Sequence, residues 1–270
     1  MESIEKLAQK YTHREMIVKH TTLPPFPHYR SELLHCVLKH DQQQDHKLYT
    51  LVTALVQLGM DSHDMVDVEE KSSSLKQMRK QQLHVLTGDY LSSKFYQLLS
   101  QAGKIGMVKQ FSQAICEVNR LKIIWYEKLK SLQYTGEQAL QDMIDIRMQL
   151  YIPCYQLLQD VTEKDWMKLL RGFTACEVLH NEIKEIKHQT LLQDSFAYRY
   201  VLEQGENWQE TSVFTTDQWK RFDEQYNVNF CLEQKLKQQW SKLKQDIVQL
   251  EDDKLVKPLL SLGQSFASHS

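Results

Sequence analysis

Apolar residues recur at every third or fourth position along most of the chain, which is the spacing that places them on one face of an α-helix. This pattern predicts helices at residues 3–18, 30–39, 48–68, 81–100, 104–131, 137–158, 162–188, 191–202 and 216–256. No stretch alternates apolar and polar residues in the way that a half-buried strand does. The pattern therefore predicts an all-α fold.

Two neighbouring predicted helices carry apolar residues on more than one face. In residues 48–68 the apolar positions cover more than one stripe of the helix, which predicts burial on several sides. For residues 81–100 we expect packing through two adjacent faces. The first face consists of Leu83, Leu86, Tyr90, the stem of Lys94, Gln97 and Leu98. The neighbouring face consists of Val85, Leu91 and Phe95. The serine run at 72–74 can cap the second of these helices.

Prolines and one polar stretch mark where the helices end. The prolines of residues 24–27 impose an extended break after the first helix, and Pro153 is expected to kink or interrupt the helix at 137–158. Residues 205–216 form the predicted long loop. Since the chain shows no repeat of fixed period and no linker, we expect one domain. Its parts are an N-terminal helix with the proline-rich break (1–29), a helical bundle (30–257) and a flexible tail (258–270).

Composition narrows the class of protein. Hydrophobic residues make up 41% of the 270 residues, and glycine (8) and proline (5) are scarce, as in a helical globular protein. A formal net charge of −2 gives no reason to expect a nucleic-acid partner. Five scattered cysteines without a CxxC pair favour a reducing compartment, so we expect a cytoplasmic protein. We expect neither a signal peptide nor a transmembrane segment, because no apolar run is long enough.

Two short motifs lie on the neighbouring predicted helices at 48–68 and 81–100. His63 and Asp64 form a pair near the end of the first, and the second contains VLTGDYL at residues 85–91. This arrangement resembles the trans-polyprenyl diphosphate synthases, whose active members carry HDDxxD on one long helix and V-L-x-G-D-Y/F-L on the next. The resemblance runs from Tyr49 to Tyr126 and is closest to the small, non-catalytic subunits of heptaprenyl diphosphate synthase, known as component 1.

The acidic ligands of an active member are incomplete at this place. In the HDDxxD register, Met65 replaces the second aspartate and Val68 the last one, while Asp61 and Asp67 lie out of register. In active members these aspartates help to hold Mg²⁺, which needs several oxygen ligands in octahedral geometry. The resemblance therefore implies no catalytic residue and no bound metal or other cofactor in this chain, with Asp64 kept as a structural or partner-facing carboxylate.

Other elements of an active synthase are also reduced. The basic signature that grips the incoming isopentenyl diphosphate near the N-terminus is represented by Arg30 alone. The adjacent aspartates Asp252 and Asp253 have Val256 where the second Asp-rich motif would end in aspartate. A solvated helix face explains this pair better than a metal site. Both differences argue against catalysis by this chain.

Two parts of the motifs also have a structural interpretation. His63 and Asp67 are four residues apart and share a helix face, but no third ligand completes a zinc site, so a hydrogen-bonded structural histidine is favoured. Gly88 and Asp89 are interpreted as a marker of the fold, with the glycine allowing two helices to approach closely. Neither group is expected to act in catalysis.

A short basic cluster precedes the second motif. It consists of Lys76, Arg79 and Lys80 and could meet a diphosphate or an anionic lipid. A solvated turn is the favoured interpretation, and a peripheral contact with the inner face of the membrane stays open.

In this family, residues one and two helical turns before the first Asp-rich motif line the tunnel that holds the growing prenyl chain. Counting back from Asp64 gives Leu55, Val56, Gly59 and Met60. Residues three and four apart share one face of a helix. The resemblance therefore implies that these four residues form a surface for the prenyl diphosphate product or for a partner chain.

The resemblance implies an isoprenoid-synthase-like helical bundle that acts as the accessory subunit of a heterodimer. Its partner would be the catalytic large subunit, which carries two DDxxD motifs and the Mg²⁺. The pair would extend farnesyl diphosphate with isopentenyl diphosphate to a C30–C35 prenyl diphosphate for menaquinone biosynthesis. This subunit would stabilise the partner and help to set the chain length. Two alternatives stay open: a diverged but self-sufficient prenyltransferase or terpene synthase, and a helical interaction protein without an isoprenoid role.

Overall fold

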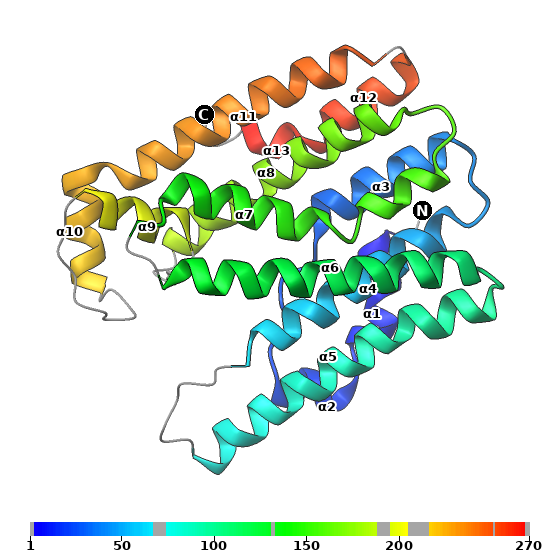
Figure 1. Cartoon of the computed structure of the whole chain (residues 1–270), viewed down its shortest axis with the longest axis horizontal. Helices are drawn as coiled ribbons and strands as arrows, with labels where there is room; N and C mark the ends of the chain where they lie inside the picture. The colour runs from blue at the N-terminus through cyan, green and yellow to red at the C-terminus, as the bar shows by residue number, and fades with distance from the viewer. Residues whose placement is uncertain are drawn as a thin grey trace. The chain divides into compact units, whose positions relative to one another are not determined.

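The computed structural model describes residues 3–66, 74–130, 133–187, 195–204, 216–250 and 252–267, and all regular elements within them are helices (Figure 1). In chain order they are α1 Ile4–Thr12, α2 Glu15–His20, α3 His28–His40, α4 His46–Asp64, α5 Leu75–Gln101, α6 Ile105–Leu129, α7 Gly136–Met148, the 3₁₀ helix η1 Ile152–Leu157, α8 Glu163–Lys187, α9 Phe196–Glu203, α10 Thr216–Tyr226, α11 Val228–Val248, α12 Asp253–Leu262 and α13 Gln264–Ala267. The all-α prediction is confirmed. Among these helices none combines the length and hydrophobicity that a membrane crossing needs.

The chain divides into two compact units. The first comprises Met1–Ala114 and Pro153–Asp160, and the second comprises Ile115–Ile152 and Val161–Ser270. Helix α6 begins in the first unit and ends in the second. That the two units behave as one folding domain stays a prediction.

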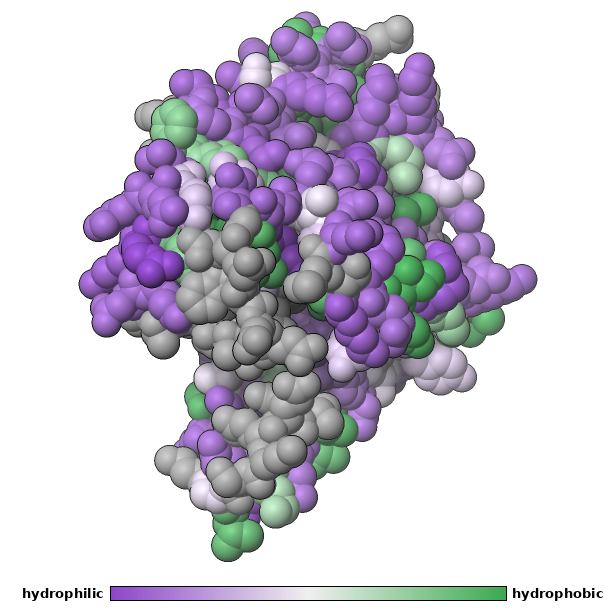
Figure 2. All heavy atoms as spheres, turned by 60° about the vertical axis from the view of Figure 1, so that its left-hand side comes forward, coloured by the Kyte–Doolittle hydropathy of each residue, from purple (hydrophilic) through white to green (hydrophobic). Residues whose placement is uncertain are grey.

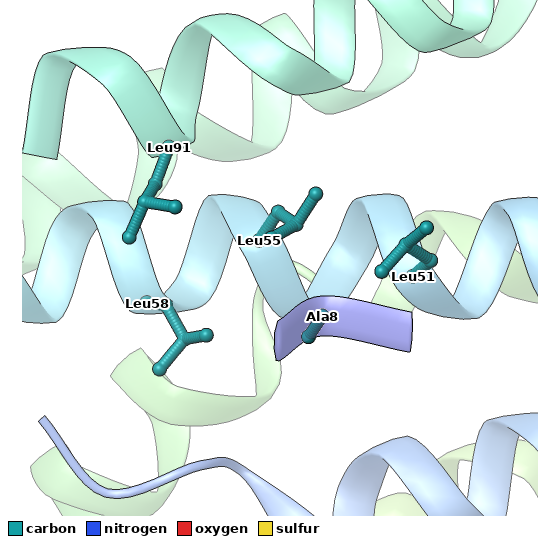
Figure 3. Packing of buried hydrophobic residues seen from close by; sticks show 5 residues of the cluster. All are labelled: Ala8, Leu51, Leu55, Leu58 and Leu91. Atoms are coloured by element: carbon teal, nitrogen blue, oxygen red, sulfur yellow. The ribbon is translucent and has the colours of Figure 1, made fainter. Parts of the chain in front are cut away.

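Helix α4 is the centre of the first unit, with α1, α3 and α5 packed against it. Its residues from 49 to 60 are all buried, so this helix is covered on several sides, as its apolar pattern predicted. Figure 3 shows Leu51, Leu55 and Leu58 of α4 packed with Ala8 from α1 and Leu91 from α5. Cutting a buried leucine back to alanine typically costs about 2–5 kcal/mol. This cluster therefore does much to fix the pairing of the three helices.

Helix α5 packs on α4 through only part of the predicted face: Leu91 lies in the leucine cluster, and Tyr90 and Leu98 pack against it as expected. The buried positions of α5 include His84, Thr87, Gly88, Leu91 and Leu99. Val85, Leu86 and Gln97, which were expected to be in contact, are exposed instead. Glycine lets two helix backbones approach more closely than any other residue, and the face that contains Gly88 is the one that meets α4. The apolar stripe therefore predicted the contact only in part.

Two predicted helices are divided in the structure. The first ends at Thr12 and restarts at Glu15, because Thr12 and His13 are both weak helix formers. The last is broken at Asn227, whose left-handed backbone (φ 52°, ψ 45°) separates α10 from α11. A further break at residues 249–252 precedes α12. None of these breaks contains glycine or proline, so the sequence carried no strong signal for them.

The tail after Pro258 is ordered, which corrects the expectation of a flexible end. Helix α12 continues through Pro258, α13 follows, and Phe266 is only 1% exposed. The ring of Phe266 lies 6.0 Å from that of Trp240 and 5.7 Å from that of His180. Full burial of such a side chain stabilises by about 1.5–3 kcal/mol, which offsets the ordering of the terminal turns. Residues 268–270 lie outside the described residues.

The second unit is built on the pairing of α8 with α11, beside α7, α9, α12 and α13. Leu243 of α11 lies against Gly172 of α8, where an added Cβ would be 2.7 Å from the leucine Cδ1. Helix α7 ends at Met148, and a 3₁₀ helix takes its place around Pro153. The predicted interruption at this proline is thus confirmed.

Candidate functional site

The two sequence motifs meet where α5 packs against the end of α4. His63 lies in the last turn of α4, and its Nε2 is 3.4 Å from Oδ1 of Asp89 on α5. A Cβ on Gly88 would lie 2.6 Å from the imidazole of His63, so the absent side chain leaves room for that ring. The structure thus brings His63, Gly88 and Asp89 together, whereas Asp64 beside them is exposed.

One turn earlier, α4 and α5 touch backbone to backbone. A Cβ on Gly59 would lie 2.8 Å from the amide nitrogen of Ser92 and 2.9 Å from the carbonyl oxygen of Gly88. Both distances are well inside van der Waals contact, and backbone atoms of a helix cannot rotate aside as a side chain can. Glycine at position 59 is therefore what allows this close approach.

Asp61, which lies out of register with the motif, belongs to a structural network. Its carboxylate accepts a 2.8 Å hydrogen bond from Nε2 of Gln57, and Oε1 of Gln57 accepts one of 3.2 Å from Nη1 of Arg30. Arg30 is only 2% exposed. A guanidinium buried in this way stabilises the contact of α3 with α4, whereas gripping a diphosphate would require an accessible one. Arg30 therefore serves the fold.

Within the described part of the chain, one group of side chains could hold a metal ion, and it is not part of the motif. It joins His40, Asp41 and Asp160 in the first unit. There Asp41 accepts the backbone N–H of Gln159 at 2.7 Å and lies 3.3 Å from Nδ1 of His40. The carboxylate is thus already engaged in closing a loop onto α3. At the end of α4, Asp61 is hydrogen-bonded to Gln57 and Asp64 is exposed, and the expectation that this chain binds no Mg²⁺ there stays a prediction.

Two positions of the degenerate motif, Asp67 and Val68, lie outside the described residues. The preference for a structural histidine over a zinc ligand at this place therefore stays a prediction. At the other aspartate pair, the side chain of Asp252 accepts the backbone N–H of Lys254 at 2.8 Å and caps α12, while Asp253 is exposed. This pair has the surface position that was expected of it.

The four residues expected to face a tunnel or a partner are buried within the first unit. Leu55 belongs to the leucine cluster of Figure 3, and Val56 has no exposed surface. Gly59 lies against α5, and Met60 keeps 6% of its surface exposed. Helices of the same chain thus cover most of this face.

One half-buried pair of histidines in the first unit carries no sequence signal. The rings of His35 on α3 and His46 on α4 lie 5.1 Å apart, and Nδ1 of His46 is 2.8 Å from the carbonyl oxygen of Gln43. Burial, helped by the neighbouring His46 and two lysines, lowers the pKa of His35 to about 4. The imidazole of His35 is therefore neutral near pH 7. Only tertiary packing brings these two residues together, so no local motif could reveal them.

A known family matches the chain over most of its length. The sequence model of the family described as heptaprenyl diphosphate synthase (HEPPP synthase) subunit 1 matches residues 15–244. The chain belongs to this family. The match runs from the start of α2 into α11 and includes both motifs, so the resemblance seen in the motifs extends well beyond them.

A curated relative supports the assignment to the subunit 1 family over a shorter stretch. Heptaprenyl diphosphate synthase component 1 of Geobacillus stearothermophilus is 35% identical to this chain over 74 residues. These residues are 27% of this chain and 31% of the relative. The matched stretch thus spans less than a third of the relative.

Solved structures share the fold of this subunit 1 family member at low sequence identity. A polyprenyl synthase from Roseobacter denitrificans has a TM-score of 0.70 at 12% identity, covering 99% of this chain and 94% of that chain. Heptaprenyl diphosphate synthase from Staphylococcus aureus has a TM-score of 0.68 at 13% identity, covering 98% and 96%. Geranylgeranyl pyrophosphate synthetase from Geoglobus acetivorans has a TM-score of 0.70 at 9% identity, covering 98% and 93%. The isoprenoid-synthase-like fold is confirmed.

Proposed function

We propose that this chain is the accessory, non-catalytic subunit of a two-component heptaprenyl diphosphate synthase. The observation that carries the proposal is a contrast at the end of α4. The helix contact that positions the family's first motif is intact, with Gly59 against Gly88, yet Met65 occupies a ligand position. Arg30, the one basic residue left from the diphosphate-binding signature, is buried. A chain that keeps this helix packing without all the metal-binding aspartates fits a subunit that supports catalysis in another chain.

The catalytic centre would then lie in a large subunit with two DDxxD motifs. Mg²⁺ held there would supply the positive charge that neutralises a departing diphosphate, and the present chain would need no cofactor. Farnesyl diphosphate and isopentenyl diphosphate are the proposed substrates, and a C30–C35 prenyl diphosphate for menaquinone is the proposed product. The family assignment supports this choice of reaction.

Exposed apolar side chains of the first unit support association with such a partner. Tyr96 on α5 and Ile105 at the start of α6 are each more than half exposed. Large apolar side chains that face solvent mark interaction sites on soluble proteins when they gather in a patch. We place the heterodimer contact on the end of α5 and the start of α6, where an obligate interface should bury at least roughly 2,000 Å² in total.

Control of product length is the finer part of the proposal. Met60 lies one turn before Asp64 and retains some exposed surface, so we place it beside the path of the growing chain. Met60→Phe should then shorten the products of the assembled complex, and Met60→Ala should lengthen them. Unchanged product length in an assembled Met60→Phe complex, with an unchanged melting temperature, would exclude this residue from the tunnel wall.

Substitution of Asp64 tests whether this chain contributes to a metal site. In a complex of this chain with the large subunit of the same organism, Asp64→Asn should leave the rate of isopentenyl incorporation nearly unchanged. Even contacts in the second shell of a metal are typically worth about 10–100-fold in activity. A loss of that size, in a complex that still assembles, would favour a self-sufficient synthase instead.

A further inference from the structure

A groove in the first unit takes no part in the proposed synthase function. It lies between α2 and the first half of α5 and has a volume of about 960 Å³. We call it the α2–α5 groove. The side chains used in the argument are Met16 and Lys19 of α2 and Leu75, Arg79, Lys80 and Leu86 of α5.

The apolar side chains of the α2–α5 groove face solvent. Leu75 is 74% exposed, Leu86 61% and Met16 59%. Figure 2 shows hydrophobic atoms at the end of the molecule where Figure 1 places the first turns of α5. Several large apolar side chains gathered at one exposed place indicate a contact with something outside the chain.

Basic side chains lie among these apolar ones. Arg79 and Lys80 are exposed and form no ion pair with any described residue. Lys19 pairs with Glu15 on its own helix. From residue 74 to residue 88 the sequence contains no acidic residue at all.

We propose that the α2–α5 groove docks the protein onto the surface of an anionic membrane. Apolar side chains can enter the boundary between headgroups and acyl chains, while lysine and arginine beside them attract anionic lipid. The groove offers both kinds of side chain on one exposed surface. Docking there would keep the subunit close to the bilayer that a long prenyl product must reach. That purpose rests on the proposed function, whereas the membrane binding does not.

Sedimentation with vesicles tests the proposal. The full chain is mixed with vesicles of phosphatidylcholine, or with vesicles that also contain phosphatidylglycerol. We expect binding to the anionic vesicles alone, and we expect added salt to weaken it. The double variant Arg79→Gln with Lys80→Gln should bind roughly thirtyfold more weakly, which is the effect of removing two basic residues from an anionic surface.

Further variants separate the apolar contribution and provide the control. Leu75→Ser with Leu86→Ser should weaken vesicle binding while its salt dependence remains. Lys220→Gln with Lys237→Gln removes the same charge from exposed positions of the second unit and should bind as the unchanged chain does. The proposal would be overturned if the control variant lost as much vesicle binding as the Arg79→Gln, Lys80→Gln variant. It would also be overturned if the unchanged chain bound neutral vesicles as well as anionic ones, or bound neither.

The synthase assay distinguishes failure of this inference from failure of the proposed function. The Arg79→Gln, Lys80→Gln variant should still assemble with the large subunit and support prenyl transfer in detergent solution. If the variant no longer binds the large subunit but still binds anionic vesicles as the unchanged chain does, the groove is a protein interface and the membrane proposal is wrong. If no partner activates prenyl transfer but vesicle binding behaves as expected, the proposed function fails and the docking surface stands.

Discussion

Replacement of Gly59 by alanine tests the contact of α4 with α5 directly. The added Cβ would lie 2.8 Å from the amide nitrogen of Ser92 and 2.9 Å from the carbonyl oxygen of Gly88. Both neighbours are backbone atoms of one helix, so the clash is relieved only if the two helices move apart. Overpacking of this kind costs about 1–3 kcal/mol, while alanine regains up to about 1 kcal/mol of helix propensity. We expect a net loss of about 1–2 kcal/mol in the free energy of unfolding.

Thermal and urea unfolding measure this loss against a matched control. Gly106 lies in the first turn of α6, where an added Cβ meets nothing within 4 Å, so Gly106→Ala should leave stability unchanged or raise it. In a chain of about this size, 1 kcal/mol shifts the melting temperature by about 2–4 °C. Gly59→Ala should therefore melt about 2–8 °C lower. A Gly59→Ala protein as stable as Gly106→Ala would refute the backbone contact.

Three further predictions concern stability. Gly88→Ala places a Cβ 2.6 Å from the ring of His63. The substitution should lower the free energy of unfolding by about 1 kcal/mol in the unchanged chain, and by much less in a chain that also carries His63→Ala. Strictly additive effects of the two substitutions would contradict the contact. Because the folded-state pKa of His35 is lowered to about 4, the unfolded chain takes up a proton at this histidine first as the pH falls. The free energy of unfolding should therefore fall by about 1–2 kcal/mol between about pH 6.5 and 4, after allowance for solvent screening. His35→Gln should flatten this part of the plot of stability against pH. Phe266→Ala should cost about 3–5 kcal/mol in urea unfolding, whereas a frayed tail would give no change.

The helical pattern was sufficient for the fold class because a period of 3.6 residues is a local property of the sequence. The breaks at His13 and Asn227 were not predictable, since neither has a nearby glycine or proline, and weak helix formers such as Thr12 and His13 also occur inside helices. The buried face of α5 was predicted only in part, with Leu91 confirmed. Leu86 is apolar but exposed, whereas Gly88 is buried, so the close approach of two backbones outweighed the apolar stripe.

The candidate site was predictable as far as the motifs reach. The sequence predicted that Gly88 allows two helices to approach closely, and the structure places His63 of α4 beside Gly88 and Asp89 of α5. The hydrogen bond from Arg30 to Gln57 was not predictable, because it joins two helices and follows no motif. An arginine that seemed left over from diphosphate binding therefore proved to be a buried part of the fold.

Incorporation of radiolabelled isopentenyl diphosphate tests the central claim most directly. The purified chain, the large subunit, and the two together are each given farnesyl diphosphate and Mg²⁺. We expect long prenyl diphosphates from the mixture alone, because Met65 and Val68 replace two aspartates of the motif that helps to hold Mg²⁺ in active members. Product formed by this chain alone at a rate comparable with that of the mixture would contradict the claim and identify a self-sufficient synthase.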